Sequence, residues 1–112
     1  MSMTNTEINT VRVDRDALEA FCKRVFEAHG LSEKDAGQAA KVLVAADARG
    51  IPSHGVARLQ LYINGLESGL MEPDAPIEVV RETASSIVIN AHGAMGAPVS
   101  IRTMQRVIEK AE

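Results

Sequence analysis

Aromatic residues and cysteine are scarce in this sequence. Among 112 residues there are no tryptophans, one tyrosine and two phenylalanines, and Cys22 is the sole cysteine. An internal disulfide is therefore excluded, and no set of cysteines and histidines has the spacing of metal ligands, so no metal site is expected. This cysteine usage predicts a reducing, cytoplasmic compartment, with Cys22 as an inert thiol of the core.

An excess of basic residues is also missing. Twelve lysines and arginines face fifteen acidic residues, which gives a formal net charge of −3. Nucleic-acid binding relies on clustered positive charge, so we expect no such partner. No apolar run approaches roughly 20 residues and the chain does not open like a signal peptide, so no membrane partner is expected. A hydrophobic share of 46% predicts a folded, soluble chain.

Two helices are predicted in the first half of the chain, packed as an antiparallel pair. The first opens at Asp14, a good N-cap, and stops at Gly30, since glycine tolerates left-handed backbone angles. The second starts at Ser32 with Asp35 in the place of a capping-box acid, and residues 49–55 break it. The apolar stripe of the first helix consists of Ala17, Leu18, Phe21, Cys22, Val25 and Phe26.

The rest of the chain predicts an α+β fold. A third helix runs from about His54 to near Gly69, residues 77–81 and 86–90 form a hairpin, and Thr10 to Val13 suit a short strand or an ordered arm. A fourth amphipathic helix is indicated by Ala97, Ile101, Met104, Ile108 and Ala111. Two strands are marginal on their own, and the fourth helix has no stop signal, so we expect an incomplete fold.

The stretch from Ser53 to Arg58 carries the most chemistry. Ser53 is predicted to cap the third helix, and His54, Arg58 and Tyr62 follow at steps of four, which places them on one helix face. A proton-exchanging imidazole, a guanidinium that grips carboxylates and a phenol suit a small anionic hydroxy or oxo acid. From spacing alone, a capping serine followed by a solvated histidine and arginine remains the plainer interpretation.

Two further histidines are interpreted without a catalytic role. His29 lies in the last turn of the first helix, where a cation complements the helix dipole. His92 opens the glycine loop of residues 92–96, which follows a strand and precedes a helix. The first glycine of a dinucleotide fingerprint is replaced there by Ala91. We therefore predict a plain strand-to-helix turn with a solvated histidine.

Residues 44–59, followed by Tyr62 and Gly69-Leu70, resemble the malate/L-lactate dehydrogenase family, which lacks a Rossmann fold. The resemblance is carried by Val44-Ala45-Ala46-Asp47-Ala48-Arg49-Gly50-Ile51-Pro52-Ser53-His54-Gly55-Val56-Ala57-Arg58-Leu59. It implies the N-terminal portion of an oxidoreductase that transfers hydride between NAD or NADP and a small 2-hydroxy or 2-oxo acid. It also implies a homodimer, a helical segment over residues 1–70 and the start of an α/β cofactor-binding domain over residues 71–112.

The same resemblance implies roles for four residues. Ser53 and His54 would lie beside the nicotinamide and the reacting carbon, both catalytic and cofactor-binding, Arg58 would hold the substrate carboxylate, and Tyr62 would line the substrate pocket. Family chains are longer and place a second histidine past Glu112, so we expect these 112 residues alone not to turn over. The alternative is a small non-catalytic helical interaction module or an inactive truncated gene product.

Overall fold

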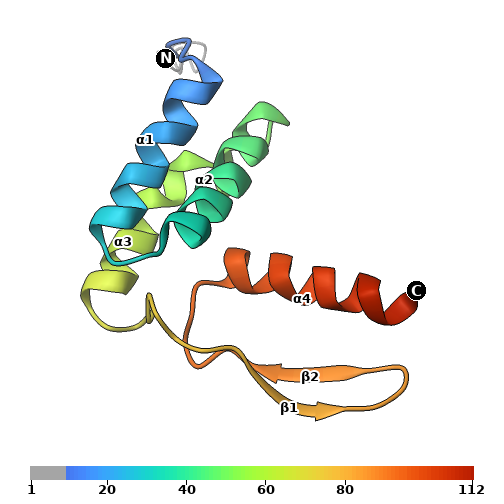
Figure 1. The fold of residues 1–112 in the computed structure, drawn as a ribbon. Coiled ribbons are helices and arrows are strands. Elements are labelled where there is room, and N and C mark those ends of the chain that lie inside the picture. The colour runs from blue at the N-terminus through green and yellow to red at the C-terminus, as the bar shows by residue number, and fades with distance from the viewer. Residues whose placement is uncertain (1–9) are drawn as a thin grey trace, which may run out of the picture.

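The computed structural model describes residues 10–112 of the chain. Within this range it contains four α-helices, short 3-10 turns and one antiparallel pair of strands, which confirms the α+β class (Figure 1). Residues 10–13, expected as a strand or arm, form neither strand nor helix. No helix within residues 10–112 has the length and apolar character needed to cross a membrane.

Helices α1 (Arg15–Ala28) and α2 (Glu33–Ala48) lie side by side, as the sequence predicts (Figure 1). The Ala17 N–H donates to Oδ2 of Asp14 over 2.8 Å, and the Asp35 N–H donates to Oγ of Ser32 over 3.1 Å. Both predicted N-caps are therefore confirmed. Gly30, at φ +100°, ends the first helix in the left-handed region.

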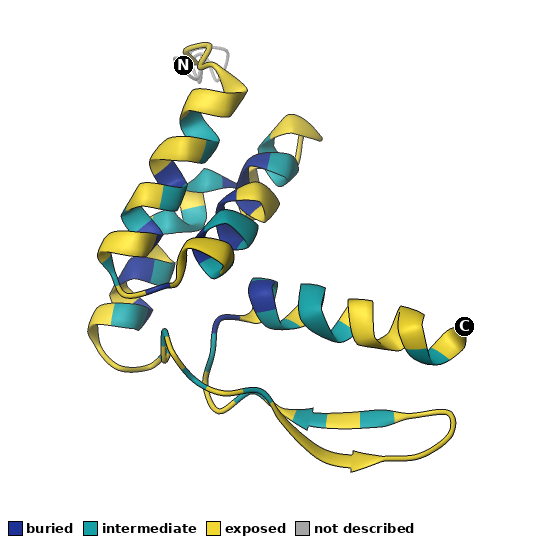
Figure 2. Ribbon diagram, in the orientation of Figure 1, coloured by how far each residue is buried: buried dark blue, intermediate teal, exposed yellow. Residues whose placement is uncertain are grey.

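The core lies between these helices and the start of α4, with small side chains on α2. Its buried residues are Cys22, Phe26, Leu31, Ala36, Ala39, Ala40, Leu43, Ile63 and Met95 (Figure 2). The alanines let the helices approach closely. Phe21, placed on the apolar stripe by the sequence pattern, is 49% exposed, because the stripe is wider than the face of α1 that its neighbours cover.

The predicted third helix is wrong in its first turns. Pro52–His54 and Val56–Arg58 form two 3-10 turns, η2 and η3, and helix α3 begins only at Leu59 and ends at Glu67. Pro52 cannot donate a backbone hydrogen bond, and Gly55, at φ −93° and ψ −149°, leaves the helical region between the turns. Ser53 consequently lies inside η2 and makes no N-cap bond with its side chain.

The predicted hairpin is confirmed, with each strand starting one residue later than expected. Strand β1 spans Glu78–Glu82 and pairs with β2, Ile87–Asn90. Val79 faces Ile89, whereas Arg81 faces Val88, so Val80 is an extra residue that forms a β-bulge. Every residue of β1 is solvent-exposed.

Helix α4, Gly96–Ala111, runs beside the hairpin (Figure 1), and three of its charged residues tie it to α2 and β1. Arg102 forms an ion pair with Asp35 of α2. Arg106 and Lys110 donate to the two oxygens of Glu82 over 3.0 and 2.9 Å. These hydrogen bonds, from Lys110 first and then Arg106, hold the pKa of Glu82 below its ordinary value.

The later turns of α4 leave apolar side chains uncovered, and the molecule is extended. Met104, Val107 and Ile108 are exposed. The radius of gyration is 17.1 Å, against about 13 Å for a compact domain of this length. The hairpin and the later turns of α4 thus project from the helical core, whereas the start of α4 packs against it.

Candidate functional site

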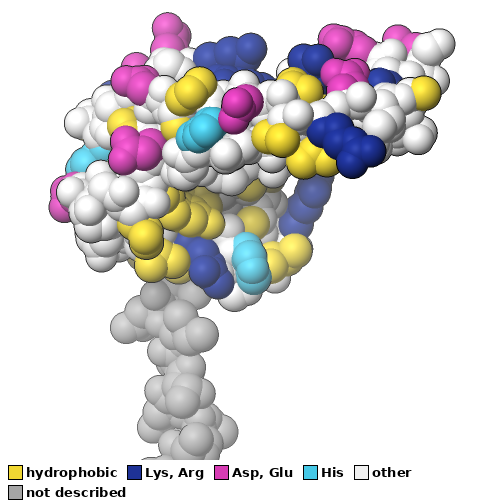
Figure 3. Space-filling model, turned by 90° about the horizontal axis from the view of Figure 1, so that it is seen from below, with side chains coloured by type: hydrophobic (Ala, Val, Ile, Leu, Met, Phe, Trp, Pro, Cys, Tyr) yellow, Lys and Arg dark blue, Asp and Glu magenta, His cyan; other side chains and the backbone are white. Residues whose placement is uncertain are grey.

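A mostly apolar cavity of about 320 Å³ lies where α2, the 3-10 turns, α3 and the start of α4 meet. Its apolar wall is made by Ala39, Val42, Leu43, Ala46, Met71, Met95 and Ala97, with the backbone of Gly96. Two polar side chains reach it, those of His54 and Tyr62. A space-filling view shows hydrophobic side chains around a hollow, with a histidine and basic side chains near it (Figure 3).

His54 ends η2 and is bonded to its neighbour in the chain. Oγ of Ser53 lies 2.9 Å from Nδ1 of His54. Whichever of the two atoms donates, this bond occupies Nδ1, and Nε2 has no hydrogen-bond partner among residues 10–112. The arrangement suits an imidazole whose Nε2 exchanges protons with a bound molecule.

Arg58 lies beside these two residues but does not line the cavity. Its Nε donates to the Ser53 carbonyl oxygen over 2.8 Å. The expected single face of His54, Arg58 and Tyr62 is wrong, because the 3-10 turns replace the continuous α-helix on which the four-residue spacing depended. The terminal Nη atoms of Arg58 have no hydrogen-bond partner within residues 10–112, so this half of the guanidinium fork remains available.

Asp47, for which sequence reasoning found no role, contacts this segment directly. Its Oδ2 accepts the Val56 N–H over 2.8 Å. The sequence feature that could have indicated a role for Asp47 is its position as an acidic residue in the last turn of α2. An acid is unfavourable next to the partial negative charge of a helix C-terminus unless something local uses it.

The other histidines and Cys22 lie elsewhere. Nε2 of His92 is 3.0 Å from Oε1 of Glu78, so this histidine, expected to be solvated, is paired with a residue of β1. His29 bonds to the Val25 carbonyl and to Glu67, which fits its structural interpretation. Cys22 is fully buried as expected, and burial, with a smaller contribution from the charge of Asp47, raises the pKa of its thiol.

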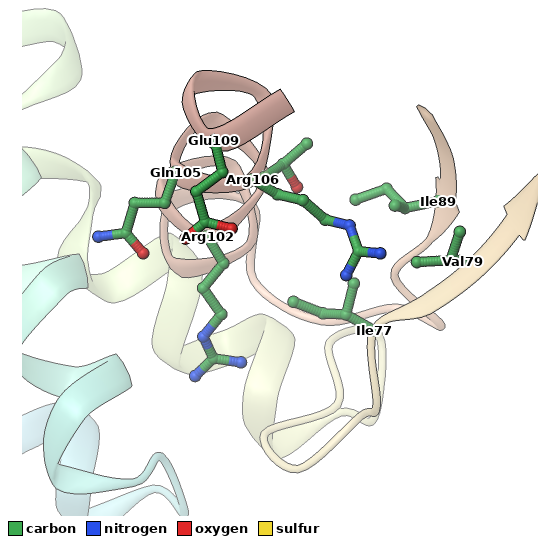
Figure 4. Close-up of a pocket in the computed structure, with 8 residues that line it drawn as sticks. Ile77, Val79, Ile89, Arg102, Gln105, Arg106 and Glu109 are labelled. Carbon is green, nitrogen blue, oxygen red and sulfur yellow. The ribbon is translucent and has the colours of Figure 1, made fainter. Parts of the chain in front are cut away.

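A second cavity, of about 300 Å³, separates α4 from the hairpin (Figure 4). Apolar side chains of the hairpin segment face the polar side of α4 across it, namely Ile77, Val79 and Ile89 on one side and Arg102, Thr103, Gln105, Arg106 and Glu109 on the other. Its two arginines are already paired, with Asp35 and Glu82. None of the four predicted site residues reaches it, so the first cavity is the candidate site.

The chain matches a protein-family model and individual relatives over most of its length. The family model described as Malate/L-lactate dehydrogenase matches residues 13–112. A malate dehydrogenase of Pyrococcus horikoshii is 40% identical over 104 residues, which are 93% of this chain and 29% of that protein. An L-sulfolactate dehydrogenase of Methanothermobacter thermautotrophicus is 33% identical over 101 residues, 90% of this chain and 30% of that protein.

Solved structures give the same result. The malate dehydrogenase from Pyrococcus horikoshii OT3 superposes with a TM-score of 0.88 at 40% identity, over 90% of this chain and 29% of that one. A delta1-piperideine-2-carboxylate reductase from Pseudomonas syringae gives a TM-score of 0.81 at 27% identity, over 91% of this chain and 31% of that one. The chain thus spans less than a third of the length of these relatives. With residues 13–112 matched by the family model, the chain belongs to the malate/L-lactate dehydrogenase family.

Proposed function

We propose that this chain supplies the substrate-handling segment of an NAD(P)-dependent oxidoreductase that acts on a small 2-hydroxy or 2-oxo acid. The observation that carries the proposal is the grouping of His54 and Tyr62 at an apolar cavity, with Arg58 bonded to Ser53 beside it. The names of the relatives point to the same substrate class, because malate and sulfolactate are both 2-hydroxy acids.

The cavity fits the reactive end of a nicotinamide cofactor. At about 320 Å³ and lined mostly by alanine, valine, leucine and methionine, it offers an apolar slot for a flat ring. Ser53 and His54 are the residues we assign to the nicotinamide, at the polar edge of the slot. When bound, the cofactor supplies or accepts the hydride at carbon 2 of the substrate.

The chain's own residues account for the remaining parts of the reaction. Arg58 binds the substrate carboxylate through its free Nη atoms, a charge-assisted contact of roughly 1.5–3 kcal/mol. His54 gives a proton to the substrate oxygen during reduction and takes it back during oxidation, a contribution of roughly 10²–10⁴ in rate. Ser53 holds the ring through Nδ1, and Tyr62 closes the pocket beside it.

The organisation of the complete enzyme is part of the same proposal. Residues 1–70 form its helical segment and residues 71–112 begin its cofactor-binding domain, in a cytoplasmic homodimer that uses NAD or NADP. The division is supported by the core, which draws all but one of its buried residues from the helical half, Met95 being the exception.

The first test addresses the carboxylate clamp. In the complete enzyme, Arg58→Ala should lower kcat/KM for the acid substrate by about tenfold to a hundredfold, mainly through KM, because the charge-assisted contact is lost. Arg58→Lys should recover part of the affinity, since it keeps the charge but not the fork. Arg24→Ala, at an exposed position of α1, is the matched control. An Arg58→Ala enzyme with unchanged kcat/KM would exclude the role.

The second test addresses proton transfer. His54→Gln should lower kcat by roughly a hundredfold or more and remove the limb of its pH profile that reports the imidazole. His92→Gln, which alters the other exposed histidine, should leave kcat and its pH profile unchanged. Normal turnover by the His54→Gln enzyme would leave this residue as part of the 3-10 turn and nothing more.

A second function, that of a non-catalytic interaction module, is favoured by one observation. Met104, Val107 and Ile108 expose an apolar strip on α4 that a binding partner would cover. Sedimentation together with hydrogen exchange separates the two proposals. A compact, uniformly protected monomer supports an independent module, whereas weak protection of the hairpin and α4 supports the dehydrogenase segment.

A further inference from the structure

Asp47 lies one residue before the end of α2, and its carboxylate leaves the helix to bond with the segment that carries His54. Oδ2 accepts the N–H of Val56, the first residue of η3, over 2.8 Å. No side chain next to η3 in the sequence caps this turn. A residue from a neighbouring element therefore does the work of an N-cap.

Gly55 makes this bond possible by having no side chain. A Cβ atom at position 55 would overlap the carboxylate of Asp47. The backbone of Gly55, at φ −93°, is outside the left-handed region, so the glycine is required by the close approach of Asp47 and not by its own conformation. Asp47 and Gly55 thus form one packed unit.

The contact between Asp47 and Gly55 holds the middle of residues 51–58, and two other hydrogen bonds hold the two ends of this segment. The Ile51 N–H donates to the Ala46 carbonyl over 2.9 Å where the chain leaves α2. Arg58 donates to the Ser53 carbonyl over 2.8 Å. His54 is the residue directly before Gly55, so its direction depends on the contact between Gly55 and Asp47.

The position of the acid on its helix supports a role beyond helix stability. Asp47 lies in the last turn of α2, where there is no basic residue and where a negative charge opposes the helix dipole. Its side chain contributes nothing favourable to α2 from that position. What it does stabilise is the turn between the two 3-10 segments.

We propose that Asp47 is a positioning residue for His54, which holds the imidazole at the cavity it shares with Tyr62 by capping η3 and packing against Gly55. The catalytic part of this inference rests on the proposed function of His54. The geometric part concerns this chain alone.

The geometric part is tested on the isotope-labelled 112-residue chain by nuclear magnetic resonance. Asp47→Ala should raise the exchange rate of the Val56 amide by about tenfold or more and shift the His54 ring signals. Asp47→Asn keeps an acceptor oxygen and should preserve both. Asp74→Ala, an exposed aspartate of the loop before β1, is the matched control. An Asp47→Ala chain with the Val56 exchange and His54 signals of the control would overturn the proposal.

Gly55→Ala covers the case in which the Asp47→Ala chain fails to fold. It keeps the aspartate but forces its carboxylate away, so the His54 ring signals should again shift while the methyl signals of Leu43 and Ile63 in the core stay in place. Unchanged His54 signals in a folded Gly55→Ala chain would equally contradict the proposal.

The catalytic part is tested in the complete enzyme. Asp47→Ala should lower kcat by about tenfold or more and raise KM by a smaller factor, because a displaced proton donor acts on the chemical step. Asp47→Asn should restore most of kcat, which a general loss of folded protein would not allow. Asp47→Ala kinetics equal to those of the Asp74→Ala enzyme would overturn this part. If the unaltered enzyme oxidises no hydroxy acid and reduces no oxo acid, the proposed function fails. The resonance experiment still tests whether Asp47 positions His54.

Discussion

His29 bonds to two acceptors through the two nitrogens of one ring. Nδ1 lies 2.8 Å from the Val25 carbonyl oxygen and Nε2 lies 3.1 Å from Oε1 of Glu67. Only the imidazolium has a proton on each nitrogen, so the charged form satisfies both contacts. The pKa of His29 is accordingly raised, first by the hydrogen bond to the Val25 carbonyl and then by Glu67, against the opposing effect of desolvation.

This raised pKa predicts a stability that depends on pH. The folded chain holds the proton of His29 more tightly than the unfolded chain, so the contribution is fully present below the ordinary pKa of about 6.5 and disappears as pH rises through the folded value. A resonance titration of His29 should show a midpoint above 6.5, and the difference in unfolding free energy between the unaltered chain and His29→Gln should shrink across that midpoint. A midpoint below the ordinary value would contradict the assignment.

At the scale of elements, the first two helices follow from the sequence because their signals are local. Asp14 and Ser32 cap helices through residues three positions away, and Gly30 ends α1 by its own backbone. The start of α3 is different. The 3-10 turns before it bring Val56 to Asp47, with Gly55 making room, which is a contact between elements that the apolar spacing does not encode.

The candidate site was predictable only in part, for the same reason. Its residue types stand together in the sequence, and His54 and Tyr62 do reach one cavity. Arg58 was expected beside them on a helix face and instead turns to the Ser53 carbonyl. The β-bulge at Val80 has a similar origin, because it depends on pairing across the sheet.

A prediction at this scale concerns the junction between the helical core and α4. Met95 immediately precedes α4, is 6% exposed and belongs to the core cluster. Met95→Ala should lower the unfolding free energy by about 2–5 kcal/mol, because it removes a buried side chain and leaves a cavity. Met104→Ala, on the exposed side of α4, is the matched control and should change stability by less than about 0.5 kcal/mol. Urea unfolding of both variants measures the difference in unfolding free energy. Equal effects would contradict the inference that Met95 anchors α4 to the helical core.

At the scale of the whole molecule, the C-terminal half of α4 turns its charged residues inward and its apolar ones outward. Arg102, Arg106 and Lys110 reach α2 and the hairpin, while Met104 and Ile108 face solvent. This is the reverse of a surface helix, whose apolar stripe faces the core. The arrangement explains why a chain with an ordinary hydrophobic share has a radius of gyration of 17.1 Å.

Solvent exposure of the site residues predicts that the 112-residue chain alone has no catalytic activity. Ser53 and His54 are exposed, so water reaches the groups that would exchange protons. Hydride transfer needs a site from which water is excluded and in which substrate and cofactor are held in register. We therefore expect the purified chain to give no NADH or NADPH oxidation above background with pyruvate or oxaloacetate. The His54→Gln chain is the control, and a rate that the unaltered chain shows and this variant lacks would demonstrate that the segment is a catalyst by itself.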